Sequence, residues 1–152
     1  MSPVNDKAAG QRILVGVDGS AASIEALEWA ARQAESTGGV LRVVLTWDWP
    51  TSYGWGFALP GDYDPAADAG KLLDETVAGV RSAHPNVELQ AVVIQGHPAP
   101  ALVDESGEAD LLVVGSRGHG EFAGMLIGSV SEHCVSNAKC PVVVVRGRPH
   151  PA

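Results

Sequence analysis

The sequence predicts a single α/β domain built on an open, five-stranded parallel sheet with helices on both faces. Two observations predict this fold class: apolar runs alternate with segments of helical periodicity, and the connections between them are short. A third is that most of these runs are apolar throughout, which is typical of strands covered on both faces. The length of 152 residues fits one domain with a sizeable core.

Five apolar runs are interpreted as the strands. In chain order they are Ile13–Val17, Val40–Thr46, Val87–Ile94, Leu111–Val114 and Pro141–Val145. The third run alternates in its first half, as expected of a strand near an edge. Right-handed crossovers leave few topologies, and we expect the order 3-2-1-4-5, which makes the first and fourth strands neighbours.

The helices are predicted from their end signals. Ser20 is expected to cap a first helix that stops at Gly38-Gly39, and Asp64-Pro65 to begin a second helix that ends before Pro85. Two shorter helices are expected over Ala101–Ser106 and Ser129–Asn137. The positions expected to be buried are Ile24, Leu27, Ala31 and Ala34 in the first helix, and Ala69, Leu72, Leu73, Thr76, Val77 and Val80 in the second.

Composition narrows the class of protein. Residues 1–11 and 147–152 are expected to be flexible tails around a domain over residues 12–146. The first twelve residues lack an apolar signal core, and no apolar run approaches the ~20 residues that span a membrane. The net charge of −8 argues against a nucleic-acid surface or an anionic membrane as partner. We therefore expect a cytoplasmic protein.

The two cysteines and one acidic turn are expected to be structural. Cys134 and Cys140 are interpreted as buried, inert thiols in preference to a disulfide or a metal pair. Glu105, Glu108 and Asp110 are interpreted as the solvated end of the third helix and its turn. None of these residues is assigned to chemistry.

The loop after the fourth strand has the composition of a phosphate site. Gly115, Gly118 and Gly120 allow a backbone to approach closely, and the next helix opens with the small residues Gly128–Ser131. A helix N-terminus offers amides and a partial positive charge to an anion. No Gly-x4-Gly-Lys-Ser/Thr motif is present, and the dinucleotide-like stretch Gly118–Ala123 follows the wrong strand for that fingerprint.

The spacing Gly115-x2-Gly118-x9-Gly128-Ser129 resembles that of the universal stress protein family, in its nucleotide-binding branch. The resemblance extends over residues 12–146 and includes Ile-Leu-Val-Gly-Val-Asp-Gly-Ser at the first strand, Gly-Ser-Arg-Gly-His-Gly in the loop, Gly-Ser-Val-Ser at the last helix and Pro-Val-Val-Val-Val-Arg at the end. The loop motif looks like that of actinobacterial members. The resemblance implies a Rossmann-like fold of the adenine nucleotide α-hydrolase type.

The resemblance also implies a ligand, ATP alone or with Mg²⁺, and the residues that hold it. Asp18 would bind the ribose or a magnesium ion beside the phosphates, and Thr46 would edge the adenine pocket through its backbone. The full set implied to contact the nucleotide is Gly16, Val17, Asp18, Thr46, Gly115, Ser116, Arg117, Gly118, His119, Gly120, Gly128, Ser129, Val130 and Ser131. The family's dimer contact would fall on the edge strand at Val142–Val145.

Alternatives stay open at this point. Asp18 is also suited to an Asx turn or a helix cap, and the aromatic loop Trp47–Tyr63 fits either a functional lid or a packed surface flap. His119 is not assigned as a base, because nothing in the sequence places a nucleophile beside it. A nucleotide-dependent stress-response protein with an unnamed regulatory partner is favoured over a slow ATPase or adenylyl-transfer enzyme, and over a dimer with a vestigial crevice.

Overall fold

The computed structural model describes residues 10–49, 64–117 and 127–146. In chain order the elements are β1 (Arg12–Gly16), α2 (Ala21–Thr37), β2 (Val40–Trp47), α3 (Pro65–Ala83), β3 (Glu88–Gln95), α4 (Pro98–Ser106), β4 (Leu111–Gly115), α5 (Ser129–Asn137) and β5 (Val142–Val145). Residues 1–9 and 147–152 of the predicted tails and most of the aromatic loop Trp47–Tyr63 lie outside the described residues.

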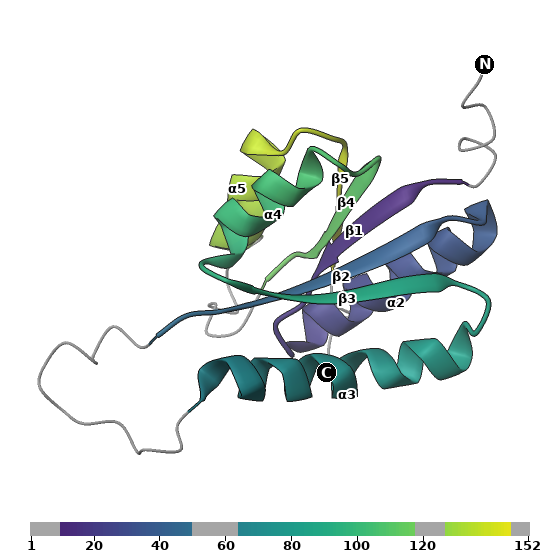
Figure 1. Ribbon diagram of the computed structural model, residues 1–152. Helices are drawn as coiled ribbons and strands as arrows, with labels where there is room; N and C mark the ends of the chain where they lie inside the picture. Colours follow the sequence, from purple (N-terminus) through teal and green to yellow (C-terminus); the bar gives the residue numbers. More distant parts are fainter. Residues whose placement is uncertain (1–9, 50–63, 118–126, 147–152) are drawn as a thin grey trace, which may run out of the picture.

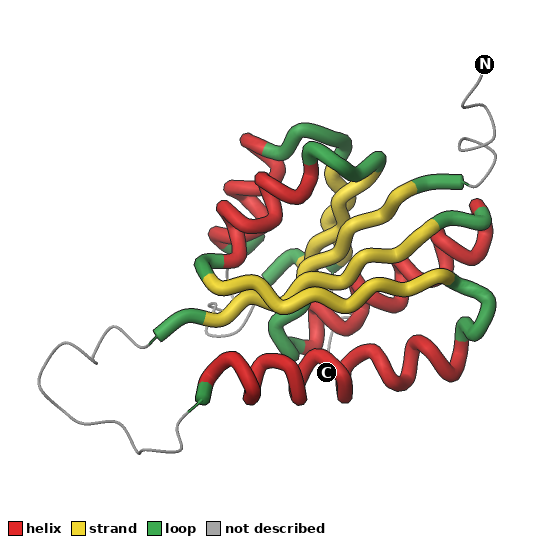
Figure 2. The backbone as a smooth tube through the Cα atoms, in the orientation of Figure 1, coloured by secondary structure: helices red, strands yellow, loops and turns green. Residues whose placement is uncertain are grey.

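The strands form one parallel sheet in the order β3-β2-β1-β4-β5, which confirms the predicted topology. Helices α2 and α3 lie on one face of this sheet and α4 and α5 on the other (Figure 1). Figure 2 shows the strands as one layer between these two pairs of helices. After β3 the chain crosses back over β2 and β1 through α4, so the strand order reverses between β1 and β4.

Each face of the sheet has its own apolar core. The first includes Ile13, Val15, Leu41 and Val43 and packs under α2 and α3, and the second includes Leu14, Val44, Leu102, Leu112 and Cys134 and packs under α4 and α5. Alternate residues of β1 and β2 therefore enter opposite cores, as the continuous apolar runs predict.

The helix ends follow the predicted signals. The Ser20 hydroxyl accepts a hydrogen bond from the amide of Ser23 at 3.3 Å, and the Asp64 carboxylate accepts one from the amide of Ala67 at 3.1 Å. Gly38 ends α2 in the left-handed conformation, with φ of 69°. Helix α4 begins earlier than predicted, at Pro98, because proline is accommodated in a first turn where its missing N–H would have no helical partner.

Three of the predicted buried positions are wrong. Ile24 and Leu72 are 36% and 39% exposed, and Thr76 is only half-buried. Helix α2 instead buries mainly small residues, namely Ser23, Ala26, Leu27, Ala30, Ala31 and Ala34. Small side chains let this helix lie close to the sheet, so Ile24 is displaced to its flank.

The end of α4 and the turn after it, which the sequence predicts to be solvated, contain two acidic residues that form ion pairs. The Arg42 Nε atom lies 2.6 Å from a carboxylate oxygen of Glu105, and Arg12 lies 3.3 Å from Asp110. Both pairs join the turn or α4 to the amino-terminal half of a strand. They are partly exposed, so each is expected to contribute little to stability.

The cysteines are free thiols in different environments. Cys134 is buried in the core under α4 and α5, whereas Cys140 is only half-buried. Burial raises the pKa of the Cys134 thiol from 9.0 to about 11. Burial, with a smaller contribution from the charge of Asp110, also raises the pKa of Cys140.

Candidate functional site

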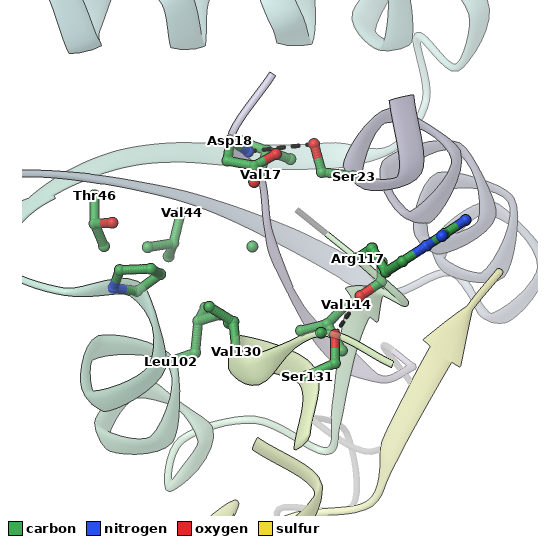
Figure 3. A pocket seen from close by; sticks show the side chains of 14 residues that line it. Val17, Asp18, Ser23, Val44, Thr46, Leu102, Val114, Arg117, Val130 and Ser131 are labelled. Carbon is green, nitrogen blue, oxygen red and sulfur yellow. Dashed lines mark hydrogen bonds between the residues drawn. The ribbon is translucent and has the colours of Figure 1, made fainter. Parts of the chain in front are cut away.

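A crevice opens where the strand order reverses, at the carboxyl ends of β1 and β4. It holds about 590 Å³ of empty space, including the part open to solvent. In open α/β sheets this is the position where ligands bind. The described residues that line it are Gly16, Val17, Asp18, Ser23, Val44, Thr46, Pro98, Leu102, Val114, Gly115, Arg117, Gly128, Val130 and Ser131 (Figure 3).

The turn between β1 and α2 is held by a compact set of hydrogen bonds. The Ser20 amide donates to the Asp18 carboxylate at 2.9 Å, which is an Asx turn. The Ser23 hydroxyl accepts from the Asp18 amide at 3.2 Å and donates to the Ser20 carbonyl at 3.0 Å. Gly19 between them has φ of 84°. These bonds fix the Asp18 backbone at the wall of the crevice.

The turn after β4 is joined to the first turn of α5. The Ser131 hydroxyl donates a short hydrogen bond to the Gly115 carbonyl, and the Gly128 amide donates to the Ser116 carbonyl. Gly128 is the residue before the first turn of α5, and having no side chain it cannot cap that turn. The N-cap residue of α5 therefore supplies no side chain that would compete with a ligand for the amides of this turn.

The other end of the crevice is apolar. Val44 and Leu102 are buried there, beside Thr46 at the end of β2 and Pro98 at the start of α4. Figure 3 shows Thr46, Val44 and Leu102 on one side of the crevice and Arg117 and Ser131 on the other. A Cβ atom on Gly16 would lie 2.6 Å from a methyl carbon of Leu102, so a larger residue there would require the Leu102 side chain to move.

Charge within the crevice is sparse. Among the described lining residues, Asp18 is the one carboxylate and Arg117 the one basic side chain. The polar groups otherwise come from hydroxyls and from backbone. A ligand with an apolar part and an anionic part would match this division.

The predicted site residues divide into three groups. Those that the structure brings together at the crevice are Gly16, Val17, Asp18, Thr46, Gly115, Arg117, Gly128, Val130 and Ser131. Ser116 is buried behind the lining residues, and Ser129 is exposed in the first turn of α5 outside them. Gly118, His119 and Gly120 lie outside the described residues.

Sequence reasoning missed five lining residues, namely Ser23, Val44, Pro98, Leu102 and Val114. Two of them had a usable signal. Val44 lies two residues before Thr46 on the same strand and so shares its face, and Leu102 lies four residues after Pro98 on the same helix face. The sequence predicts that this helix begins at Ala101, so it does not place Pro98 on the same helix as Leu102.

The fold and crevice define a class, the doubly wound α/β proteins with a ligand-type crevice at the switch point of the sheet. Within that class the chain belongs to the universal stress protein family. The sequence model of that family matches residues 10–146.

Individual relatives agree with this assignment. Universal stress protein Rv2623 of Mycobacterium tuberculosis is 42% identical over 136 residues, which cover 88% of this chain and 44% of the relative. The chain spans less than half the length of the curated relatives it matches.

Solved structures agree as well. A universal stress protein in complex with cAMP is 29% identical, with a TM-score of 0.68, covering 92% of this chain and 99% of that one. The universal stress protein of Archaeoglobus fulgidus in complex with dAMP shares the fold, at 22% identity and a TM-score of 0.65, over 90% of this chain and 98% of that one.

Two other kinds of feature, a metal-binding cluster and a membrane-spanning helix, are absent from the described residues. Within the described ranges, no group of three or more His, Cys, Asp or Glu side chains is arranged to hold a metal ion. No helix among the described elements has the length and apolar character needed to cross a membrane.

Proposed function

We propose that the protein binds an adenine nucleotide, ATP alone or with Mg²⁺, and that the bound nucleotide sets its activity as a stress-response regulator. The observation that carries this proposal is the division of the crevice into a polar end at α5 and an apolar end at α4. The universal stress protein solved with cAMP supports an adenine nucleotide as the ligand class.

The phosphates are assigned to the α5 end. Gly128 contributes no capping side chain to the first turn of α5, and Val130, Ser131 and Arg117 line the crevice beside that turn. Amides at a helix N-terminus, with a hydroxyl and a guanidinium nearby, are the groups that bind phosphate. We include Ser116, Gly118, His119, Gly120 and Ser129 in this end of the site.

The base is assigned to the α4 end. Helix α4 also begins at the crevice, but Pro98 and Pro100 occupy its first turn and remove two amide donors. The two helix N-termini at the crevice are thus unequal, since α5 offers donors where α4 offers apolar rings. This difference, with Val44 and Leu102 beneath, favours one orientation of a nucleotide, with Gly16, Val17 and Thr46 against its nucleoside part.

The carboxylate of Asp18 is suited to binding a magnesium ion. Magnesium is usually held by one or two carboxylates together with substrate phosphates and water. Asp18 is one carboxylate at the crevice wall, held by its turn on the side of the crevice formed by β1 and α2. We propose that it binds the ribose or a Mg²⁺ ion that the nucleotide brings with it.

The proposal also includes the oligomeric state of the protein, its partner and its location in the cell. We propose a homodimer through the β5 edge, because an apolar edge strand needs a cover and a two-fold contact supplies the same surface from both copies. We further propose a regulatory protein partner and a cytoplasmic location, where ATP is supplied.

Calorimetric titration of ATP into the nucleotide-stripped full chain, with and without magnesium, tests the proposal. The expected result is saturable heat with about one nucleotide per chain and a rise in melting temperature, since a ligand that binds only the native state stabilises it. GTP serves as the matched control and is expected to bind more weakly. Absence of both heat and thermal stabilisation would overturn the proposal.

The alternative function is slow ATP hydrolysis or adenylyl transfer. Phosphoryl transfer generally uses a basic side chain, a metal-binding carboxylate and a group that orients the nucleophile. Arg117 is a candidate for the basic side chain, and Asp18 is a candidate for the metal-binding carboxylate. Assay of the titrated mixture for ADP separates the functions: little ADP over hours supports a regulator, and rapid release of ADP supports an enzyme.

A further inference from the structure

The outer edge of β5 presents the backbone groups of only two residues. The carbonyls of Pro141 and Val145 accept hydrogen bonds from the amides of Leu112 and Ser116, at 2.9 and 2.8 Å, and so point toward β4. Backbone groups of successive residues in a strand point to opposite sides. The N–H and C=O groups of Val142 and Val144 therefore point away from β4, and no described strand pairs with that edge.

Ser116 joins this edge strand to the candidate phosphate site. Its amide donates to the Val145 carbonyl at the end of β5, and its carbonyl accepts from the Gly128 amide at the start of α5. Ser116 itself is 4% exposed, so water does not compete freely for either bond. One buried peptide segment thus lies between the first turn of α5 and the last residue of the edge strand.

A second bond strengthens the connection. Gly115 is the register partner of Val145, and its carbonyl accepts the short hydrogen bond from Ser131. Both residues that precede Arg117 therefore accept hydrogen bonds from the α5 end of the crevice, and Ser116 in addition donates one to β5. A change in the position of the α5 first turn would be transmitted to the end of the edge strand through these backbone contacts.

We infer that nucleotide binding and pairing of the β5 edge with a second copy of this chain are thermodynamically coupled through Ser116. This inference rests on the proposed function. A nucleotide that orders the α5 first turn also orders Ser116 and the end of β5, and an edge already ordered loses less entropy when it pairs. ATP therefore strengthens the dimer, and by linkage the dimer binds ATP more tightly by the same factor.

The first experiment uses the unaltered full chain. The dissociation constant of the dimer is measured by sedimentation with and without saturating ATP and magnesium. The expected change is at least about fivefold tighter association with ATP, the lower end of typical coupling between sites. A dimer whose dissociation constant is the same with and without bound ATP would overturn the coupling while leaving the proposed function intact.

The second experiment blocks the edge. Val144→Pro removes an N–H group that points outward, so the bonds between β5 and β4 remain. Val144→Ala is the control, because it loses more of the side chain but keeps the N–H group. The proline variant is expected to be monomeric and to bind ATP at least about fivefold more weakly than the dimeric wild type, and the alanine variant is expected to behave as wild type.

The outcomes separate the two proposals. Wild-type protein that binds no ATP would overturn both. A Val144→Pro variant that is monomeric and binds ATP with the affinity of the wild-type dimer would overturn the coupling alone, and so would a Val144→Pro variant that remains dimeric. If Val144→Pro does not fold, the sedimentation experiment on the unaltered chain still decides the matter.

Discussion

Gly115 at the end of β4 lies against the backbone of Ala22 in the first turn of α2. A Cβ atom built on Gly115 would lie 2.7 Å from the Ala22 carbonyl carbon and 2.8 Å from its oxygen. The backbone of Ala22 cannot move away from an added methyl group as easily as the end of a flexible side chain could. The first glycine of the loop motif therefore has a packing reason, in addition to any role toward a ligand.

We predict that Gly115→Ala destabilises the protein by about 1–3 kcal/mol, the usual range for overpacking. The added methyl would force α2 away from β4. Urea denaturation, followed by circular dichroism, measures the effect in nucleotide-free protein. An alanine variant with wild-type stability would show that the contact relaxes easily, and would leave Gly115 with a role toward the ligand only.

Gly79→Ala is the matched control and a prediction of its own. Gly79 lies inside α3, and a Cβ atom there would meet nothing within 4 Å. Alanine in an open helical position is favoured over glycine by about 0.5–1 kcal/mol. The variant is expected to be more stable than wild type by that amount in the same denaturation experiment. A loss of stability would contradict the described environment of α3.

The structure permits a sharper test of Asp18 than removal of its side chain. Its carboxylate accepts a hydrogen bond from the Ser20 amide, and asparagine retains an oxygen that can accept it. Asp18→Asn therefore keeps the turn and removes the charge. We predict unchanged stability and an affinity for ATP with magnesium that falls at least about tenfold, or about 1.4 kcal/mol.

Magnesium provides the control for Asp18→Asn. Titration in the presence of a chelator is expected to show a smaller difference between variant and wild type, because the lost charge then has no cation to bind. Equal affinities for magnesium-bound ATP would remove Asp18 from the metal and leave it as a turn residue. The Asx turn and the ligand role would then be separated by experiment.

We predict that the buried Cys134 thiol causes the protein to lose stability in alkaline solution. Its pKa is raised by burial from 9.0 to about 11. Well below pH 9 the thiol is protonated in both states and has no effect on the pH dependence of stability. Between about pH 9 and 11 the unfolded chain ionises while the native protein does not, so the free energy of unfolding falls by up to about 1.4 kcal/mol per pH unit.

Comparison with Cys134→Ala isolates this contribution. The variant is expected to be less stable at pH 7, because it leaves a cavity in the core, but to have a shallower pH dependence above pH 9. Other groups titrate in the same range, so the difference in slope between the two proteins is the quantity to measure. Identical slopes would contradict the shifted pKa.

Much of the fold could be predicted because its strands are continuous apolar runs separated by strong end signals. Ser20, Gly38 and Asp64 each end or begin a helix as expected, since their side chain or lack of one decides the local backbone. The helical period predicts that Ile24 is buried because it takes account of hydrophobicity and not of the distance between helix and sheet. The close approach of Ala22 to Gly115, which favours small residues on the buried face of α2, is a tertiary contact.

The candidate site was less predictable. Gly16, Asp18 and Gly128 stand in recognisable turns, so their place at the crevice follows from the topology. Pro98 and Leu102 enter it only because α4 crosses back over the sheet and begins three residues before the predicted start. Ser23 was unpredictable for another reason, since its role depends on bridging the Asp18 amide and the Ser20 carbonyl in three dimensions.

The two edges of the sheet are chemically unlike each other. Edge strand β3 begins and ends with the exposed polar residues Glu88 and Gln95, whereas β5 consists of four half-buried valines. In the proposed dimer, the β5 edges of the two copies pair with each other, and the two polar β3 edges form the outer edges of the combined sheet. Growth of the sheet then stops at two copies, so a strand well suited to forming fibres gives a closed particle instead.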